Sequence, residues 1–400
     1  MTTTNTAFRR RVSPTERMYF PMRDLAPPFL MQMEFRGAGS LDADELRRAV
    51  AIAADACPGA RLVRDGRYWV DGGVAPAVRE ISGYVANEPR LEADSVLTSP
   101  IGPNPETTCE VLLLTGESVS VVFRVFHGVM DGMGMALWAK SVFRVLRGGE
   151  PLPLPDPIAD HELVRRVGAP GRPTPMAPRF RSAVGHGRQD PGVARHLLRH
   201  RTIDATGPGA VARIAGMLAT EAGTPQRIMV PVDLRRHDPE LRSTANLALP
   251  LFLDVAPGQN WPEINAEKRI GLRERRELNQ MASTGLANVP PAVGRAILRT
   301  TNWLGSRYGR NLASATVSHM GRFDLEDLRF GDFSPTSVRV LPQHSVAMPL
   351  LFAMVEAGGR TELTVSARNG RGVEGRLEAL LDRVASTLEE ELPQRDSTPA

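Results

Sequence analysis

The sequence predicts an α/β (α+β) fold with two lobes, each combining helices with a mixed, mostly antiparallel sheet. The 400 residues exceed what one compact core usually contains, so two domains are expected. Strand-like and helix-like apolar patterns alternate in both halves. A proline-rich connector at Pro151–Pro157 separates these halves. We therefore expect an N-terminal lobe at 1–158, a crossover segment at 159–205 and a C-terminal lobe at 206–400.

The first half opens on a strand pattern, because Met31, Met33 and Phe35 alternate with polar residues and indicate a half-buried strand. A helix is expected from Leu41 to about Cys57, since acidic residues occupy its first turn and Pro58-Gly59 follows it. Turn residues predict two hairpins, which join Arg61–Val63 to Tyr68–Val70 and Val111–Leu114 to Val119–Phe126.

The stretch Val119–Phe143 contains the strongest functional signal. Val119–Phe126 is almost continuously apolar, which indicates a strand buried on both faces. From Gly134 onward the apolar residues follow a helical period as far as Gly148-Gly149. The turn between them, His127–Gly132, holds a His and an Asp four residues apart, and its glycines permit a tight bend. Strand and helix can therefore fix both side chains in defined orientations.

The span His161–Arg201 is basic and weakly patterned, which favours a crossover with short helices. His196 and His200 are four residues apart, a spacing that can bind a metal on a helix. No HExxH pattern or cysteine cluster accompanies them, so we expect a solvated helix face and no metal site.

The second half repeats the alternation of strands and helices. Helices are expected at Ala210–Ala222, Ile264–Met281 and Arg376–Leu392. Strands are expected at Gln226–Pro231, at Leu247–Val255, around Val317, and at Phe352–Glu356 and Glu362–Ser366.

Composition points to a globular cytoplasmic protein, which we expect to be a monomer. Hydrophobic residues make up 42% and charged residues 24% of the chain. No apolar run reaches membrane-spanning length, and the amino terminus lacks the apolar core of a signal peptide. Cys57 and Cys109 are the only cysteines, so no disulfide framework is expected.

The net charge is +4, and arginine supplies nearly all of the positive charge, since lysine occurs only at Lys140 and Lys268. Arginines cluster at Arg9–Arg11 and in the helix-like segment Arg269–Leu278. We interpret the second cluster as a solvated helix face. The alternative is a patch for the phosphates of CoA or for an acidic carrier protein. Nucleic acid is not an expected partner, because no aromatic platform or binding motif accompanies the charge.

Three segments resemble signatures of the condensation-domain and CoA-dependent acyltransferase superfamily, which shares the chloramphenicol-acetyltransferase-like fold. Phe126–Gly132, FHGVMDG, resembles the HHxxxDG motif, with Phe126 in place of the first His and His127 as the second. Pro231–Arg235, PVDLR, with Asn246 and a following Pro-Leu, resembles a second signature. Val317–Gly321 resembles the later VSNxG segment, with His319 where Asn is usual. The three occur in the family's order.

The resemblance implies two lobes forming a V, with the active site in a tunnel between them. It marks His127 as the catalytic residue and pairs Asp131 with Arg235 in a structural ion pair. Gly132 would keep the pantetheine channel open. The substrate channel would be lined by Asn246, Ser318 and His319. The alternative for His319 is a position on the surface, which we slightly favour. The group that stabilises the oxyanion could be Ser318, Asn246 or a backbone N–H, and the sequence does not choose between them. The role of His344 is undecided.

These observations predict a stand-alone acyltransferase, with ester formation preferred. An acyl group would pass from acyl-CoA or carrier-bound phosphopantetheine to a hydroxyl or amine of a small-molecule, natural-product acceptor. His127 would act as general base, because an imidazole titrates near neutrality. The thioester is a co-substrate, and no bound cofactor is expected. Glu274 and Glu277 interrupt the arginine cluster, which favours free acyl-CoA over an acyl carrier protein.

Two alternatives remain. The first is an amide-forming or cyclising condensation enzyme of the same fold, although the missing first His argues mildly against it. The second is a catalytically silent protein that docks a carrier protein. Such proteins usually lose the catalytic His, which is present here as His127.

Overall fold

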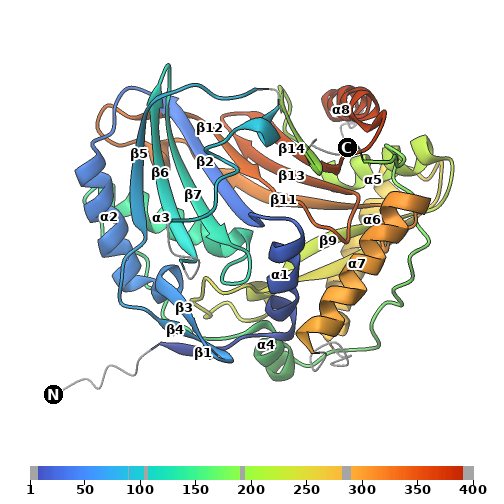
Figure 1. The fold of residues 1–400 in the computed structure, drawn as a ribbon, viewed down its shortest axis with the longest axis horizontal. Helices are drawn as coiled ribbons and strands as arrows, with labels where there is room; N and C mark the ends of the chain where they lie inside the picture. The colour runs from blue at the N-terminus through green and yellow to red at the C-terminus, as the bar shows by residue number, and fades with distance from the viewer. Residues whose placement is uncertain (1–7, 89, 103–106, 190–193, 282–289, 391–400) are drawn as a thin grey trace, which may run out of the picture.

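The computed structural model describes residues 8–88, 90–102, 107–189, 194–281 and 290–390 (Figure 1). Within them, two large sheets stand side by side and a small sheet lies below the first. The first large sheet has the order β12-β2-β7-β6-β5 and the second the order β10-β9-β11-β13-β14-β8. Most neighbouring strands are antiparallel, and the pairs β5/β6, β9/β11 and β11/β13 are parallel. The expected α/β (α+β) class with mixed, mostly antiparallel sheets is confirmed.

The strands of the first large sheet are β2 (Leu30–Ala38), β5 (Ala77–Tyr84), β6 (Cys109–Gly116), β7 (Val119–Phe126) and β12 (Ser334–Leu341). Those of the second are β8 (His196–Ile203), β9 (Gln226–Asp233), β10 (Ala248–Val255), β11 (Ala315–Phe323), β13 (Leu350–Ala357) and β14 (Arg360–Arg368). The small sheet contains β1 (Arg9–Arg11), β3 (Leu62–Asp65) and β4 (Tyr68–Asp71).

The helices cover the outer faces of the sheets and also bridge the two lobes. They are α1 (Pro14–Leu25), α2 (Ala43–Ala56), α3 (Gly132–Leu146), α4 (Asp160–Val167), α5 (Ala210–Ala222), α6 (Trp261–Arg273), α7 (Pro291–Tyr308) and α8 (Val373–Glu389). Helices α2 and α3 pack together on the first large sheet, and α5 and α8 pack together on the second. Helix α1 packs against α7 at the front of the molecule (Figure 1).

Two strands cross the boundaries expected from the sequence. Strand β12 comes from the second half of the chain but pairs with β2 in the first sheet, with Val338 opposite Phe35. Strand β8 lies within the expected crossover segment but pairs with β14 in the second sheet. One strand of the second half thus completes the first sheet, and the division at 1–158, 159–205 and 206–400 stays a prediction.

The half-buried strand expected around Met31–Phe35 is instead buried on both faces. Gln32 and Glu34 are only 7% and 2% exposed, because each finds a buried arginine. The Arg124 Nε donates to Gln32 Oε1 at 3.0 Å, and Arg339 forms an ion pair with Glu34. A polar residue in an alternating pattern can thus be fully buried when a neighbouring strand provides an opposite charge or a hydrogen-bond donor for it.

His196 and His200 lie on strand β8, so the expected helix at this position is wrong. The His196 ring stacks on His344 with 5.0 Å between centroids, and His200 Nε2 is 2.7 Å from a carboxylate oxygen of Glu362. The pairing of β8 with β14 decides this conformation. In the described part of the chain, no three His, Cys, Asp or Glu side chains are grouped as a metal site would require.

The long helix expected at Ile264–Met281 is also wrong, because α6 ends at Arg273. Arg275 has a φ of 55°, and a 3-10 helix follows at Arg276–Met281. This break turns Leu278 into a buried cluster and brings Glu277 within 2.8 Å of His237 Nε2. Burial of these two side chains therefore outweighs the local helical pattern. Helix α8 ends at Glu389, and the expected terminus at Leu392 lies outside the described residues.

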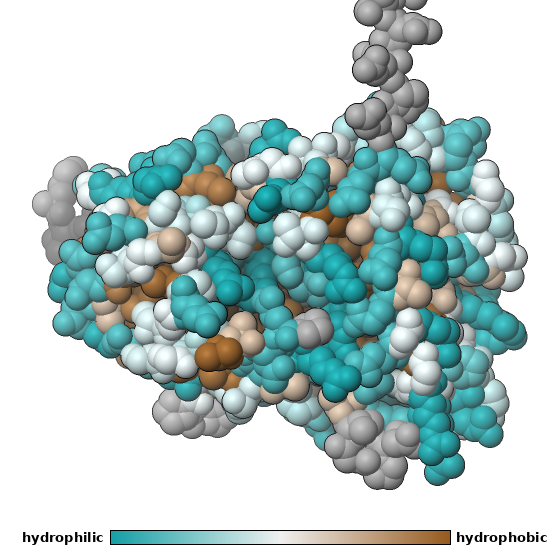
Figure 2. Space-filling view, turned by 90° about the horizontal axis from the view of Figure 1, so that it is seen from above, coloured by the Kyte–Doolittle hydropathy of each residue, from teal (hydrophilic) through white to brown (hydrophobic). Residues whose placement is uncertain are grey.

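The surface seen from above is mostly hydrophilic, with separate hydrophobic patches (Figure 2). Among the described helices, none combines the length and the apolar character of a membrane span.

The start of α3 touches a loop from the other half of the chain. A Cβ atom on Gly134 would lie 2.1 Å from the backbone oxygen of Thr244, a distance that real Cβ atoms do not reach. Only a glycine permits this approach without a backbone shift. The contact fixes the helix that follows the His127–Gly132 turn against the segment Ser243–Leu247.

A matched pair of glycine substitutions tests this contact. Gly134→Ala should lower the free energy of unfolding by about 1–3 kcal/mol, because the methyl group must displace backbone. Gly375, also the third residue of its helix, has open space around its Cβ position. Gly375→Ala should therefore raise the free energy of unfolding by about 0.5–1 kcal/mol. Urea denaturation of both variants makes the comparison, and equal effects would mean that the approach of α3 to Thr244 is not constrained.

Candidate active site

The turn His127–Gly132 connects the fully buried strand β7 to helix α3. Asp131 is the N-cap of α3, and its Oδ1 accepts a hydrogen bond from Gly134 N–H at 2.7 Å. The Val129 N–H donates to the Phe126 carbonyl at 2.9 Å and closes the bend. A rigid strand and a capped helix therefore hold both ends of the turn.

Phe126 occupies the place where the resembling motif has its first His. A Cβ atom on Gly128 would lie 2.3 Å from the Phe126 ring, so this ring covers the turn. The ring also packs against Phe20, with centroids 5.5 Å apart, and is only 2% exposed. The position therefore supports the turn by apolar packing, and His127 is the one imidazole of the turn.

The His127 imidazole is held in one tautomer. Its Nδ1 lies 3.1 Å from the carbonyl oxygen of Met130, which can only accept a hydrogen bond. The proton must therefore sit on Nδ1, and the lone pair is on Nε2. Burial lowers the pKa of His127 below its usual value, so the neutral form dominates at neutral pH. Asn246 Nδ2 donates to the His127 carbonyl at 2.9 Å and fixes its backbone.

Two aromatic rings enclose the imidazole. Tyr19 of α1 stacks on it with 4.6 Å between centroids and 15° between planes, and Phe29 lies 6.4 Å away. Burial raises the pKa of the Tyr19 hydroxyl, which therefore remains protonated. The sequence analysis missed both residues, and it missed Tyr19 because it did not identify α1. The helix signal was present as a capping box, in which Ser13 and Glu16 exchange hydrogen bonds.

The structure brings Asp131 and Arg235 together as an ion pair across the two halves of the chain. The Arg235 Nη1 and Nη2 donate to the two carboxylate oxygens at 3.0 and 3.2 Å, and both residues are largely buried. Burial alone would lower the pKa of Arg235, but Asp131 and Asp233 outweigh it and raise this pKa. Leu247 N–H adds a third donor to Asp131, at 2.6 Å.

Arg10 fastens the N-terminal arm to the same turn. Its Nη2 donates to the Val129 carbonyl at 3.0 Å, and its Nη1 pairs with Glu16 at 2.5 Å. Arg10 is only 2% exposed, so this member of the Arg9–Arg11 cluster is not part of a charged surface patch.

An inner cavity of about 690 Å³ lies between the lobes, and His127 is in its wall. Gly132, Ser318 and His319, three of the residues expected along the channel, also line it, and so does Asp131. Arg235 and Asn246 do not, because they lie behind the turn and hold it. The tip of Met320 occupies the space beside Gly132, 2.5 Å from where a Cβ would be. Eight of the chain's 15 methionines line this cavity, including Met18, Met31, Met133 and Met229.

Two hydroxyl-bearing residues of β11, Thr316 and Ser318, also line this mostly apolar cavity. Ser318 Oγ donates a hydrogen bond to the sulfur of Met320 at 3.9 Å. Thr316 is 2% exposed, and among the described residues its hydroxyl has no hydrogen-bond partner. A buried polar group without a partner is costly, so a ligand that hydrogen-bonds to Thr316 would gain affinity. The sequence analysis did not single out Thr316.

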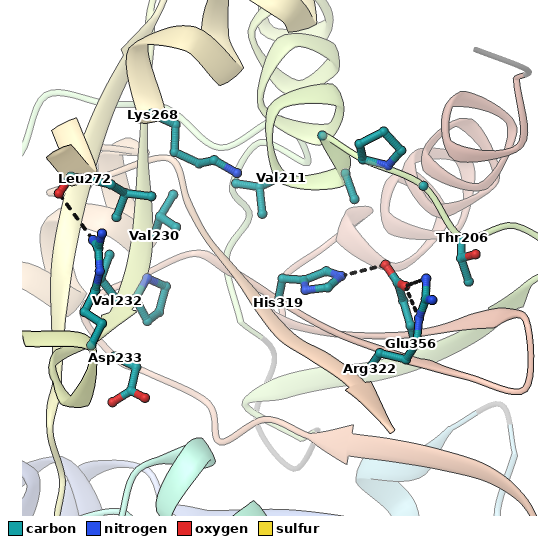
Figure 3. A pocket seen from close by; sticks show the side chains of 16 residues that line it. Thr206, Val211, Val230, Val232, Asp233, Lys268, Leu272, His319, Arg322 and Glu356 are labelled. Atoms are coloured by element: carbon teal, nitrogen blue, oxygen red, sulfur yellow. Dashed lines mark hydrogen bonds and ion pairs between the residues drawn. The ribbon is translucent and has the colours of Figure 1, made fainter. Parts of the chain in front are cut away.

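An outer cavity of about 740 Å³ adjoins the inner one (Figure 3). The two share Pro231, Asp233 and His319 as walls. His319 Nδ1 accepts from Gly321 N–H at 3.2 Å, and its Nε2 lies 3.1 Å from Glu356. His319 thus stands on the partition between the cavities. His344 is buried against His196 instead and lines neither cavity, and burial keeps its pKa well below the usual value.

Comparison with solved structures places this fold among condensation domains. The starter condensation domain of rhizomide synthetase, in a complex with C8-CoA, has 17% identity and a TM-score of 0.62, and 97% of each chain is covered. The first condensation domain of the calcium-dependent antibiotic synthetase has 16% identity and a TM-score of 0.61, with 96% of this chain and 97% of that chain covered. Polyketide synthase associated protein 5 from Mycobacterium tuberculosis has 16% identity and a TM-score of 0.61, with 96% and 98% covered.

No protein-family model and no curated protein sequence matches the chain. The structural likeness confirms the condensation-domain fold that the three sequence segments implied.

A double-mutant cycle tests whether Asp131 and Arg235 act as one unit. Asp131→Asn and Arg235→Met should each lower the free energy of unfolding by about 3–5 kcal/mol, because each leaves one buried charge without its partner. Asn remains a good N-cap, so Asp131→Asn isolates the effect of charge. The double variant should lose much less than the sum of the two.

The exposed pair Arg329 and Glu326 serves as control, and its cycle should show no resolvable coupling. Additive losses for Asp131 and Arg235 in chemical denaturation would contradict their action as a unit.

Proposed function

We propose that this chain is an acyltransferase that moves an acyl group from a thioester to a small-molecule acceptor, with His127 as general base. The single observation that carries the proposal is the position of His127, which lines a cavity between the two lobes and whose Nδ1 faces the Met130 carbonyl, so that Nε2 is the unprotonated ring nitrogen. An unprotonated imidazole nitrogen can take a proton from a hydroxyl or an amine. The condensation-domain fold supports the same reaction class.

The reaction would proceed by direct attack. His127 Nε2 removes the proton from the acceptor hydroxyl as its oxygen attacks the thioester carbonyl carbon. The resulting oxyanion needs hydrogen-bond donors, and the hydroxyls of Ser318, which donates to a weak sulfur acceptor, and of Thr316, which has no partner among the described residues, support β11 as their source. Collapse of this intermediate breaks the carbon–sulfur bond, and the thiolate receives the proton from His127.

Asp131 would contribute through position rather than proton transfer. Its two carboxylate oxygens already accept hydrogen bonds from Arg235, Gly134 N–H and Leu247 N–H. The proton on His127 Nδ1 is instead held by the Met130 carbonyl. The ion pair therefore keeps the turn in place while the backbone selects the tautomer.

The inner cavity suits a flexible aliphatic acyl chain. Methionine side chains are unbranched and polarizable, so they adapt to chains of different shape. The neighbouring starter condensation domain was solved with C8-CoA, a medium-length acyl thioester. We therefore propose a fatty acyl group of medium length as the transferred group.

Ester formation is the first choice for the product, because Phe126 replaces the first His of the condensation motif. Amide formation is the second, since the rhizomide starter domain was also solved with C8-CoA and Leu-SNAC, an aminoacyl acceptor analogue. A catalytically silent docking protein would have no need for a preserved tautomer at His127. Assays with hydroxyl and amine acceptors distinguish the two products.

Removal of the imidazole should stop the chemistry without preventing binding. His127→Ala should lower the rate of acyl transfer by about 10²–10⁴-fold, the usual contribution of a positioned general base. Donor binding, measured by calorimetry, should change little. His200→Ala, on the far edge strand β8, is the control and should retain its turnover. Near wild-type turnover of His127→Ala would remove this residue from the mechanism.

The pH profile should report the buried imidazole. Burial lowers the pKa of His127, and only its neutral form accepts a proton. kcat/KM should therefore rise with pH through an apparent pKa below about 6.5 and stay level across neutral pH. The measurement is kcat/KM from pH 5 to 8 with a donor that does not titrate. An acidic limb centred above pH 7 would contradict a neutral His127 as the base.

A further inference from the structure

The outer cavity is formed almost entirely by the second lobe. Its walls are the loop and first turn of α5, the end of β9, the inner side of α6, and β11 with β13. Figure 3 shows Lys268 reaching across it from α6 towards Val211 at the start of α5. Because Pro231, Asp233 and His319 also line the inner cavity, one extended ligand could occupy both spaces.

The charges in this cavity are paired, with one exception. Asp233 lies 2.7 Å from Arg235, and Glu356 binds both Arg322 at 2.9 Å and His319. Arg236 lies 3.6 Å from the carboxylate of Glu277. Among the described residues, no carboxylate lies within ion-pair distance of the Lys268 amine, whose only charged influence is Arg269.

Lys268 is therefore a half-buried cation without a counter-ion. Burial and the neighbouring Arg269 both lower the pKa of its amine, so the charged form is disfavoured while the cavity is empty. An anion placed beside the amine would reverse this penalty. The first turn of α5, whose N-cap Gly209 supplies no side-chain oxygen, adds backbone N–H donors on the opposite wall.

We propose that the outer cavity binds the phosphoryl groups of a free CoA thioester, with Lys268 as the anchoring cation. The proposal rests on the acyl-transfer function proposed above. A CoA thioester carries its charged phosphoryl groups at one end and its reactive carbonyl at the other, joined by an uncharged, flexible arm. Two adjoining cavities, one with a free cation and one with the His127 base, match this distribution of charge.

The arginine cluster Arg269–Leu278 does not provide this site. Arg276 is neutralised by Glu267 at 2.5 Å and Glu274 at 2.7 Å, and Arg273 is exposed. This agrees with the interpretation of the cluster as a solvated surface. The cation that faces the cavity is Lys268, which the sequence analysis did not select because its neighbours dominate the local charge.

The test compares a donor that carries phosphoryl groups with a shortened donor that carries none. Acyl-CoA and the N-acetylcysteamine thioester of the same acyl group are supplied to the wild type, Lys268→Met and Lys268→Arg. Lys268→Met should raise the KM for acyl-CoA about tenfold and leave the KM for the N-acetylcysteamine thioester unchanged. Lys268→Arg should restore most of the affinity for acyl-CoA. The matched control is Lys140→Met, which removes the only other lysine and should behave as the wild type.

Binding of CoA alone, measured by calorimetry, separates this proposal from the proposed function. If wild-type protein transfers acyl groups from neither donor but binds CoA less tightly after Lys268→Met, the site stands and the reaction assignment fails. If transfer occurs and Lys268→Met changes both donors equally, or neither, the site is overturned. A carrier-bound donor that is strongly preferred and insensitive to Lys268→Met would overturn it as well.

Discussion

The ion pair of Asp131 and Arg235 is the interaction on which the arrangement of the site depends. A buried carboxylate is stable only when its charge and its lone pairs are satisfied, and here Arg235, Gly134 and Leu247 all contribute. These partners come from the 3-10 helix after β9, from the first turn of α3 and from the loop before β10. The same contact therefore holds both lobes in register at the point where His127 meets the cavity.

Sequence periodicity predicted the elements around His127 because local forces determine them. A continuous apolar run followed by a helical period can form only a buried strand and an amphipathic helix. Tyr19 was missed because α1 begins at a cap rather than on an apolar stripe, and it contains Pro21. Glu34 was misread as exposed because its partner Arg339 lies some 300 residues away, and a single sequence does not reveal such a pairing.

Burial has opposite uses in the two cavities. In the inner cavity it makes protonation of His127 unfavourable, which favours the neutral imidazole at neutral pH. In the outer cavity it makes an empty, charged Lys268 unfavourable, which favours a bound anion. The same effect, burial, can thus favour a neutral imidazole in one cavity and a bound anion in the cavity that shares a wall with it. Sequence alone did not reveal this contrast, because burial at Lys268 arises from α5 and α6 packing together.

Strand β12 constrains the order in which the two sheets can be completed during synthesis. The first sheet lacks its edge next to β2 until Ser334–Leu341 has left the ribosome. Until then Glu34 has no Arg339, and the backbone of β2 presents unpaired donors and acceptors. The edge of β2 in the nascent N-terminal half therefore stays unpaired until most of the chain has been translated. Such late closure favours slow folding and a need for chaperone protection.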